Sequence, residues 1–277
     1  MTTPAAAPGG RGGPGGPGRR RKPPKPAEVV SVSSISARLV SVLVSGDGLD
    51  GFADAAPTSH LKVFLPADGQ DAPNLPEYTP DGPVYADEGP RPVVRTYTPR
   101  RYDPAAGTLE IQFLLHGEGP ASAWAAAAKP GDKLAVAGPG GRFSLEPSAD
   151  YWWLAADESA LPAVGTLLEA LPETATADVH VEVDSPDDEI ELRGPAKAVV
   201  TWHYRKPRVY GQMLATAASE AGIPDGGRIW VACESAAMRD IRRYFTRERG
   251  IPAGQLVTRG YWRAGEQNYP DHDYGED

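Results

Sequence analysis

The sequence has one cysteine, Cys233, so it forms no internal disulfide, no four-cysteine iron–sulfur site and no structural zinc site. Its five histidines are scattered, with no pair at metal-ligand spacing. No apolar run approaches the roughly 18 residues of a membrane-spanning helix. The arginines at 19–21 continue into Pro and Lys rather than the apolar stretch of an export signal. We therefore expect a soluble, cytoplasmic protein with no metal of its own.

Glycine and proline are abundant instead, with 31 and 29 residues in a chain of 277. Both interrupt helices, which excludes a helical bundle or coiled coil. Segment 1–27 holds 14 of them and six Arg or Lys, with no acidic or aromatic residue, so we expect a disordered tail. The other 250 residues carry a net charge of −15. We expect no nucleic-acid partner, because its phosphates would be repelled.

The first half after the tail predicts an antiparallel β-barrel. Short strands at close spacing, with one small helix, are typical of that fold, which also removes exposed sheet edges. We expect a long surface loop at 66–92 and a helix at 120–128. The expected strands occupy 29–44, 60–65, 93–98, 108–115 and 133–138.

From about residue 150, strands and helices alternate, which predicts a parallel α/β sheet that binds ligands at the carboxyl ends of its strands. The expected strands are 151–156, 178–183, 198–204 and 228–233, and the expected helices are 161–171, 209–221 and 236–249, the last with a basic face. We expect a tail at 1–27, a barrel domain at 28–147, an α/β domain at 148–266 and an acidic tail at 267–277.

Two segments of the barrel half suggest a flavin site. Strand alternation places Arg95 and Tyr97 on one face, so that the ring can flank a flat heterocycle while the guanidinium pairs with a phosphate; a surface cross-strand pair is the alternative. Further on, Gly117 and Gly119 precede a helix that begins at Pro120. The free N–H groups there, with the Ser122 hydroxyl, favour an anion such as a pyrophosphate, although a capped helix needs no ligand.

Together the motifs resemble the siderophore-interacting proteins, a branch of the ferredoxin-reductase-like flavoproteins, over about residues 30–265. The motifs are Arg95-x-Tyr97-Thr98-Pro99-Arg100, His116-Gly117-x-Gly119-Pro120-Ala121-Ser122-x-Trp124, Gly138-Pro139-x-Gly141, Ala156-Asp157-Glu158-Ser159-Ala160-Leu161-Pro162, Trp202-x-x-Arg205 and Gly260-Tyr261-Trp262-Arg263.

The resemblance implies a six-stranded FAD-binding barrel followed by an NAD(P)H-binding α/β domain, and reduction of a ferric siderophore with electrons from NADH or NADPH. In such a reaction no side chain need act as general acid or base, so we assign no catalytic residue. The resemblance also implies that Lys62, Arg142 and Arg263 meet the anionic chelate. The cofactor-binding residues that it implies are Arg95, Tyr97, Thr98, His116, Gly117, Gly119, Ala121, Ser122, Asp157, Glu158 and Trp262.

Three positions depart from the family pattern. Gln112 occupies a position where an acidic residue is usual, Ala156 replaces a glycine, and Cys233 precedes Glu234 where Gly-Glu is common. We expect the Ala156 methyl to crowd a phosphate. Cys233 is either a thiol near the nicotinamide or a small buried residue.

An acidic run after the strand at 178–183 favours NADH over NADPH, because carboxylates repel a 2′-phosphate and accept from a 2′-hydroxyl. The run contains Asp184, Asp187, Asp188 and Glu189, whereas Arg193 or Arg205 would reverse the preference. Two other functions remain open: a flavin-free siderophore-binding protein, and an FAD-dependent reductase that serves a ferredoxin or an oxygenase. We expect a monomer.

Overall fold

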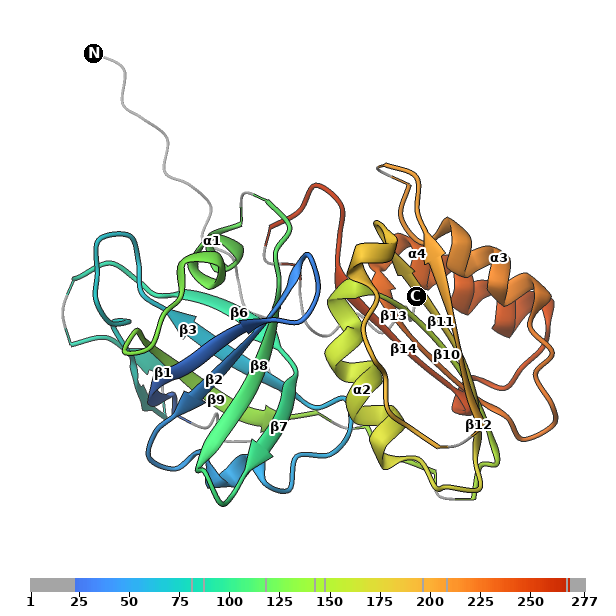
Figure 1. Ribbon diagram of the computed structural model, residues 1–277, viewed down its shortest axis with the longest axis horizontal. Helices are drawn as coiled ribbons and strands as arrows, with labels where there is room; N and C mark the ends of the chain where they lie inside the picture. Colours follow the sequence, from blue (N-terminus) through green and yellow to red (C-terminus); the bar gives the residue numbers. More distant parts are fainter. Residues whose placement is uncertain are drawn as a thin grey trace, which may run out of the picture.

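The computed structural model describes residues 23–80, 82–86, 88–117, 119–141, 143–146, 148–195, 197–207, 209–267 and 269. Two lobes lie side by side, an antiparallel β lobe followed in the chain by an α/β lobe (Figure 1). This order confirms the predicted fold class.

Within the described residues, the β lobe is one antiparallel sheet of seven strands, in the order β6-β3-β9-β1-β2-β8-β7. Alternate side chains of these strands point inward, as the half-polar pattern of the sequence predicts. The inward set includes Val29, Val42, Val63, Ile111 and Val136, all almost fully buried. The strands are β1 (Lys25–Ser34), β2 (Leu39–Ser45), β3 (His60–Leu65), β6 (Val93–Tyr97), β7 (Pro99–Asp103), β8 (Thr108–Leu114) and β9 (Lys133–Gly140).

The ends of this sheet belong to one bent segment. β6 pairs with β3 and β7 pairs with β8, while Thr98 alone separates the two strands. Pro99 has no N–H to donate, so the hydrogen-bonded ladder stops at the bend. Among the described residues no ladder joins β6 to β7, which corrects the expected full closure of the barrel. The expected six strands are obtained when β6 and β7 are counted as one.

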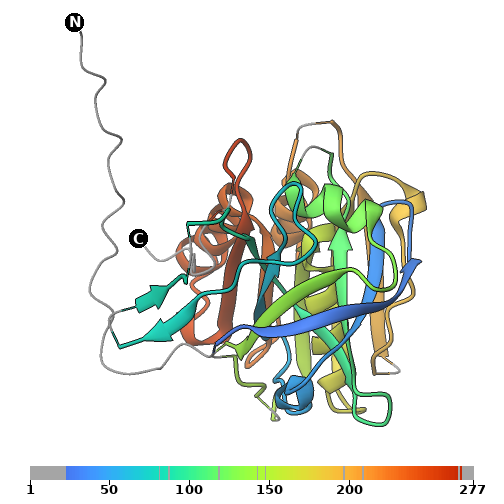
Figure 2. The same ribbon diagram turned by 90° about the vertical axis from the view of Figure 1, so that its left-hand side faces the viewer.

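Two details differ from the expected barrel half. β1 begins at Lys25, inside the segment 1–27 that we expect to be disordered, because residues 25–28 pair with β9. Residues 1–22 of that segment lie outside the described part. The expected loop 66–92 contains a short hairpin of β4 (Glu77–Thr79) and β5 (Gly82–Val84), which stands out from the barrel in Figure 2.

The second lobe is a parallel sheet of five described strands in the order β12-β11-β10-β13-β14. The edge strand β14 (Leu256–Trp262) was not predicted, and it pairs in parallel with β13. The other four confirm the predicted alternation: β10 (Tyr151–Asp157), β11 (Thr176–Val183), β12 (Lys197–Tyr204) and β13 (Arg228–Glu234).

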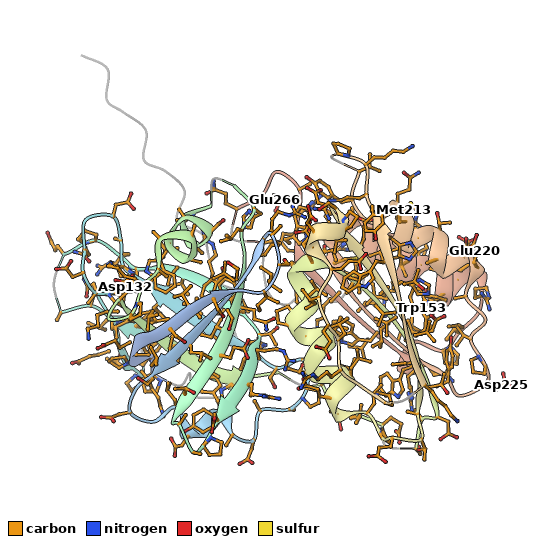
Figure 3. All side chains as sticks on the ribbon, in the orientation of Figure 1. Asp132, Trp153, Met213, Glu220, Asp225 and Glu266 are labelled. Atoms are coloured by element: carbon orange, nitrogen blue, oxygen red, sulfur yellow. The ribbon has the colours of Figure 1, made fainter. Side chains whose placement is uncertain are left out.

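Helices cover both faces of the parallel sheet. α2 (Leu161–Ala170) lies between the sheet and the barrel, and Leu39 of the barrel belongs to the same buried cluster as its apolar residues (Figure 1). α3 (Gln212–Glu220) and α4 (Ser235–Arg243) cover the other face around Trp153, which Figure 3 places inside the lobe. A π-helical turn, Tyr244–Glu248, extends α4, and α1 (Pro120–Ala127) follows β8.

Carboxylates at three strand ends cap the helices at the carboxyl edge of the parallel sheet. They accept hydrogen bonds from backbone N–H groups that a helix start leaves without intrahelical partners. Asp157 accepts from Ser159 (3.0 Å), Glu182 from Gly211 (2.6 Å) and Met213 (3.1 Å), and Glu234 from Ala236 (2.7 Å) and Ala237 (3.0 Å). This edge is therefore acidic.

Gly211 is the N-cap residue of α3 and packs against Ala237 of α4, and we expect Gly211→Ala to lower the free energy of unfolding by about 2–3 kcal/mol. Its φ is +72°, and an added Cβ would lie 2.1 Å from the Ala237 Cβ, so one helix must shift. Urea unfolding measures the effect. Gly222→Ala is the control, because no atom lies within 4 Å of its Cβ position, and it should change stability by less than about 0.5 kcal/mol. Equal losses in the two variants would contradict this packing.

In the described part of the chain, no helix combines the length and apolar character needed to cross a membrane.

Candidate functional site

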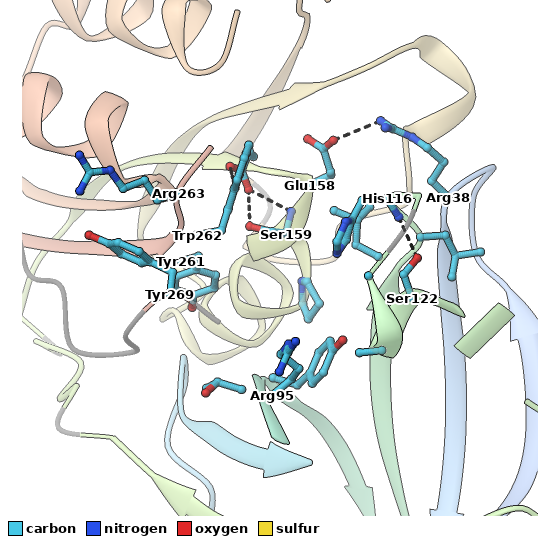
Figure 4. Close-up of a pocket in the computed structure, with 18 of the residues that line it drawn as sticks. Arg38, Arg95, His116, Ser122, Glu158, Ser159, Tyr261, Trp262, Arg263 and Tyr269 are labelled. Carbon is cyan, nitrogen blue, oxygen red and sulfur yellow. Dashed lines mark hydrogen bonds and ion pairs between the residues drawn. The ribbon is translucent and has the colours of Figure 1, made fainter. Parts of the chain in front are cut away.

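A cavity of about 880 Å³ lies between the two lobes, within the size range of cofactor sites. Both lobes line it: the end of β6, the start of α1 and the carboxyl edge of the parallel sheet. Figure 4 shows Arg95, His116 and Ser122 from the barrel facing Glu158, Ser159 and Trp262 from the α/β lobe. Among the predicted cofactor residues, the lining includes Arg95, Tyr97, Thr98, His116, Gly117, Gly119, Ala121, Ser122, Asp157, Glu158 and Trp262.

The barrel wall of the cavity is aromatic and cationic. The Tyr97 ring packs 4.4 Å from the Phe113 ring, measured between centroids, and burial raises the pKa of its hydroxyl. Arg95 donates to the Val94 carbonyl at 2.9 Å, which holds its guanidinium at the cavity. Thr98 is buried at the strand bend and hydrogen-bonds the Tyr261 side chain of β14. A flat ring and an anion can both be bound on this wall.

The turn from β8 into α1 forms a second part of the barrel wall. The His116 N–H donates to the Ser122 hydroxyl oxygen at 3.0 Å, which holds the turn against the helix. Gly117 has a φ of +86°, a conformation that a side chain disfavours, and Gly119 precedes the helix, where a Cβ would lie 3.0 Å from the His116 ring. The first N–H groups of α1 therefore lie beside the cavity without side chains in front of them.

Gln112 supplies an unpaired acceptor at the cavity. Its amide nitrogen donates to Glu110 at 2.8 Å, whereas its Oε1 is buried and has no hydrogen-bond partner among the described residues. A buried polar atom without a partner is costly, and a ligand N–H would satisfy it. The residues present thus fit a flat, hydrogen-bonding heterocycle that carries phosphates, as FAD does.

On the α/β wall, Asp157 holds Trp262. Its Oδ2 accepts from the Trp262 indole N–H at 2.7 Å and from the Glu234 N–H at 2.9 Å. Burial, and next the neighbouring charge of Glu158, raises the pKa of Asp157 to about 7, against the hydrogen bonds from Ser159 and Trp262. The indole also packs edge-on against Tyr210, with 4.7 Å between centroids. Trp262 is therefore fixed to the α/β lobe at the cavity.

Glu158 is the centre of an ion-pair cluster, defined here as Arg38, Glu158, Asp184, Asp188 and Arg205. Both Glu158 oxygens accept from Arg205, and Oε1 also accepts from Arg38 at 3.1 Å. Arg38 belongs to the barrel lobe, in the loop between β1 and β2, and it also binds Asp188 at 2.9 Å. The cluster therefore links the two lobes at one end of the cavity.

Of the cations expected at the chelate, Arg263 lines the cavity and Lys62 does not. Arg263 lines the cavity, is 54% exposed and pairs with Glu266 at 3.3 Å; Figure 3 places Glu266 at the junction of the lobes. Lys62 lies on β3, outside the lining residues, and donates to Thr96 at 2.7 Å, which does line the cavity. Arg142 lies outside the described residues.

Ala156 and Cys233 point away from the cavity. Ala156 is fully buried in the apolar cluster that contains Leu161 and Val181, so the expected clash of its methyl with a phosphate is wrong. Cys233 is fully buried on the other face, and burial raises the pKa of its thiol well above the usual range. Of the two alternatives for Cys233, a thiol near the nicotinamide or a small buried residue, the structure supports the second.

Two histidines that are distant in the sequence meet on the parallel sheet. The His180 Nδ1 lies 3.0 Å from the His203 Nε2, and the rings stack. The adjacent strands β11 and β12 bring them together, which sequence spacing could not reveal. Within the described ranges no third ligand completes a metal site there.

Sequence reasoning missed several lining residues. Most come from segments without a recognised motif, whereas Tyr261 belongs to the motif Gly260-Tyr261-Trp262-Arg263, of which only Trp262 and Arg263 were expected at the site. The Tyr269 hydroxyl hydrogen-bonds the Ser235 hydroxyl at the start of α4, at 2.8 Å, so Tyr269 lies against the carboxyl edge of the sheet. The missed residues include Arg38, Thr58, His60, Tyr210, Arg259, Tyr261 and Tyr269.

The fold is of the ferredoxin-reductase type. The ferredoxin reductase of carbazole 1,9a-dioxygenase superposes with a TM-score of 0.60 at 19% identity, covering 84% of this chain and 67% of that one. A siderophore utilization protein from T. fusca superposes with a TM-score of 0.78 at 36% identity, covering 91% of this chain and 98% of that one.

The chain belongs to the siderophore-interacting protein family. Residues 28–143 match the siderophore-interacting FAD-binding domain, and residues 149–265 match the siderophore-interacting protein domain. The ferric vibriobactin reductase ViuB of Vibrio cholerae is 32% identical, over 86% of this chain and 89% of its own length. The NADPH-dependent ferric-chelate reductase of Escherichia coli is 34% identical, over 83% of this chain and 89% of its own length. The resemblance inferred from the motifs is thereby confirmed.

Proposed function

We propose that this protein is an FAD-dependent reductase that takes electrons from a nicotinamide dinucleotide and reduces a ferric siderophore, which releases Fe(II). We propose that the protein acts in the cytoplasm and is a monomer. One observation carries the proposal: a single cavity joins the flavin-compatible wall of the barrel to the carboxyl edge of the parallel sheet. Parallel α/β sheets bind dinucleotides at that edge. The two names of the relatives, a ferric vibriobactin reductase and a ferric-chelate reductase, support the choice of substrate.

Reduction releases iron because oxygen donors of a siderophore prefer hard Fe(III) and hold the softer Fe(II) more weakly. FAD, when bound, supplies the conversion from hydride to single-electron transfer. The protein therefore needs no iron ligand of its own, and within the described residues no cluster of three metal-binding side chains occurs.

The side chains of the cavity bind and orient. Tyr97 would flank the ring system of FAD, Arg95 would pair with a phosphate, and the N–H groups at the start of α1 with Ser122 would bind the pyrophosphate. Trp262, fixed by Asp157, shields the α/β side of the cavity from water. Arg263, exposed at the same cavity, attracts the anionic chelate, with Lys62 and Arg142 as further candidates.

Gln112→Met is expected to weaken FAD binding about fivefold to tenfold, because about 1 kcal/mol of hydrogen bonding to the ligand is lost. The free protein should keep its thermal midpoint, since it loses only an unpaired acceptor and one amide bond. Titration of the flavin-free protein with FAD measures the dissociation constant. Gln212→Met, on the exposed side of α3, is the control. Unchanged affinity in Gln112→Met would remove Gln112 from the flavin site.

Anaerobic assay tests the activity. FAD-loaded protein with NADH or NADPH is mixed with ferric hydroxamate and catecholate siderophores, and a ferrous chelator reports release. We expect Fe(II) from at least one chelate class, and none without FAD. If a yellow, FAD-loaded protein oxidises the dinucleotide yet releases no Fe(II) from either class, the chain is a reductase for another acceptor. If it purifies without flavin and binds none, it is a binding protein.

A further inference from the structure

We propose that Asp184 makes this protein select NADH over NADPH, by rejecting the 2′-phosphate at the adenosine end of the donor. The inference rests on the proposed use of a nicotinamide dinucleotide and names the residue that decides which one. Asp184 directly follows β11, the second strand of the parallel sheet along the chain. In dinucleotide-binding sheets, an acidic residue in this region binds the ribose 2′-hydroxyl, and an arginine takes a 2′-phosphate.

The position of Asp184 connects it to the cofactor cavity. Asp184, Arg38 and Arg205 all line the same cavity as Tyr97 and the turn before α1. Arg205 directly follows β12, the strand that pairs with β11, so the two side chains come from adjacent strand ends. A dinucleotide whose nicotinamide reaches the flavin-compatible wall can therefore extend its adenosine toward this end of the cavity.

Asp184 occupies the outward side of both arginines. Its Oδ2 lies 3.1 Å from one terminal nitrogen of Arg38, and its Oδ1 lies 3.1 Å from a terminal nitrogen of Arg205. The Asp184 side chain is 49% exposed, whereas those of Glu158 and Asp188 are 7% and 4% exposed. Asp184 is thus the most exposed carboxylate of the ion-pair cluster, and it lines the cavity together with the more buried Glu158.

The net charge of the cluster disfavours binding of a phosphate. Three carboxylates face two guanidinium groups, which leaves one negative charge. A phosphate monoester carries close to two negative charges at neutral pH, so it would have to displace Asp184 or lie against it. A ribose 2′-hydroxyl instead donates a hydrogen bond to the exposed carboxylate at no such cost. The relative from Escherichia coli is named as NADPH-dependent, so this chain would differ from it in donor.

Neutralising Asp184 should remove most of the preference for NADH without moving the arginines. Arg205 keeps its paired bonds to Glu158, and Arg38 keeps Asp188 at 2.9 Å and Glu158 at 3.1 Å. Asp184→Asn retains the size of the side chain and makes the cluster neutral. Both guanidinium groups then present N–H donors, in fixed positions, to a phosphate in the cavity.

The test measures equilibrium binding of NAD⁺ and NADP⁺ to the FAD-loaded protein by calorimetry, with KM values for NADH and NADPH as a second readout. We expect the wild type to bind NAD⁺ at least tenfold more tightly than NADP⁺. Asp184→Asn should shift this ratio toward NADP⁺ by about tenfold or more. Flavin content and thermal midpoint should stay at the wild-type values. Asp187→Asn is the control, because it removes the same charge from an exposed residue of the adjoining turn Pro186–Asp188. Its ratio should stay within twofold of the wild type.

Two results overturn the inference while leaving the proposed function intact. The first is a wild type that binds NADP⁺ as tightly as NAD⁺ or more tightly. The second is an equal shift in Asp184→Asn and Asp187→Asn, which would show a general effect of surface charge. A third result is different: if neither NADH nor NADPH reduces the bound flavin of the wild type, the proposed donor fails and the inference fails with it.

Discussion

The Tyr97→Ala variant should fold but purify with little flavin. Tyr97 lines the cavity and packs against Phe113, so its ring offers one flat apolar surface backed by a second aromatic. Removing the ring costs roughly 2–3 kcal/mol of contact with a bound heterocycle, which raises the dissociation constant of FAD about 100-fold. Ferric reduction should fall in proportion to flavin occupancy and recover when FAD is added in excess.

Two further variants separate the cavity from general packing. Tyr102 also packs against the barrel core but does not line the cavity, so Tyr102→Ala should lower stability and keep the flavin. Tyr97→Phe keeps the ring and should bind FAD within a few-fold of the wild type. The assignment of Tyr97 fails if Tyr97→Ala and Tyr102→Ala retain the same flavin content.

The Glu158→Gln variant should lose about 2–3 kcal/mol of unfolding free energy. The Glu158 side chain is 7% exposed, and its carboxylate binds Arg38 from the barrel lobe and Arg205 from the α/β lobe. A neutral amide leaves the Arg205 guanidinium, itself only 8% exposed, with Asp184 as its remaining carboxylate. A buried charge that loses a partner is costly, whereas Arg38 keeps Asp188 and limits the loss. Urea unfolding, followed by far-UV circular dichroism, measures the change.

Glu169→Gln provides the matched control, because Glu169 and Arg100 also pair across the two lobes, from α2 to β7, at 2.6 Å. Glu169 is 30% exposed, so water compensates for much of the lost pair and the cost should stay below about 1 kcal/mol. Similar losses in the two variants would show that burial of Glu158 has no special weight at the lobe junction.

Local patterns predict most elements of this fold, because alternating and helical periodicities report which face of a segment is buried. The strand 151–156 and the helix 161–171 are found in this way. β14 was not predicted because Arg259 and Gly260 interrupt its apolar pattern, and its position at the sheet edge depends on pairing with β13. The open ladder at Thr98 depends on the geometry of a bend that composition does not encode.

The residues that line the cavity also fall into a set that the sequence predicts and a set that it does not. The flavin-compatible wall is predictable because Arg95, Tyr97 and the turn after His116 are each contiguous in the chain. The ion-pair cluster is not, since Arg38 and Asp188 are 150 residues apart and meet only in the folded protein. The contacts of Asp157 are also unpredictable from the sequence, because its partners are distant in the chain. The motif predicts Asp157 as a cofactor residue, whereas in the structure its carboxylate accepts hydrogen bonds from the Trp262 indole and the Glu234 backbone.

A single-turnover measurement tests the central claim most directly. FAD-loaded protein is reduced without oxygen by one equivalent of NADH and then mixed with excess ferric siderophore and a ferrous trap. Since a hydride carries two electrons and each Fe(III) accepts one, the account predicts two trapped Fe(II) per protein as the flavin absorbance returns. A flavin that stays reduced in the presence of every ferric siderophore, with no Fe(II) trapped, would contradict it.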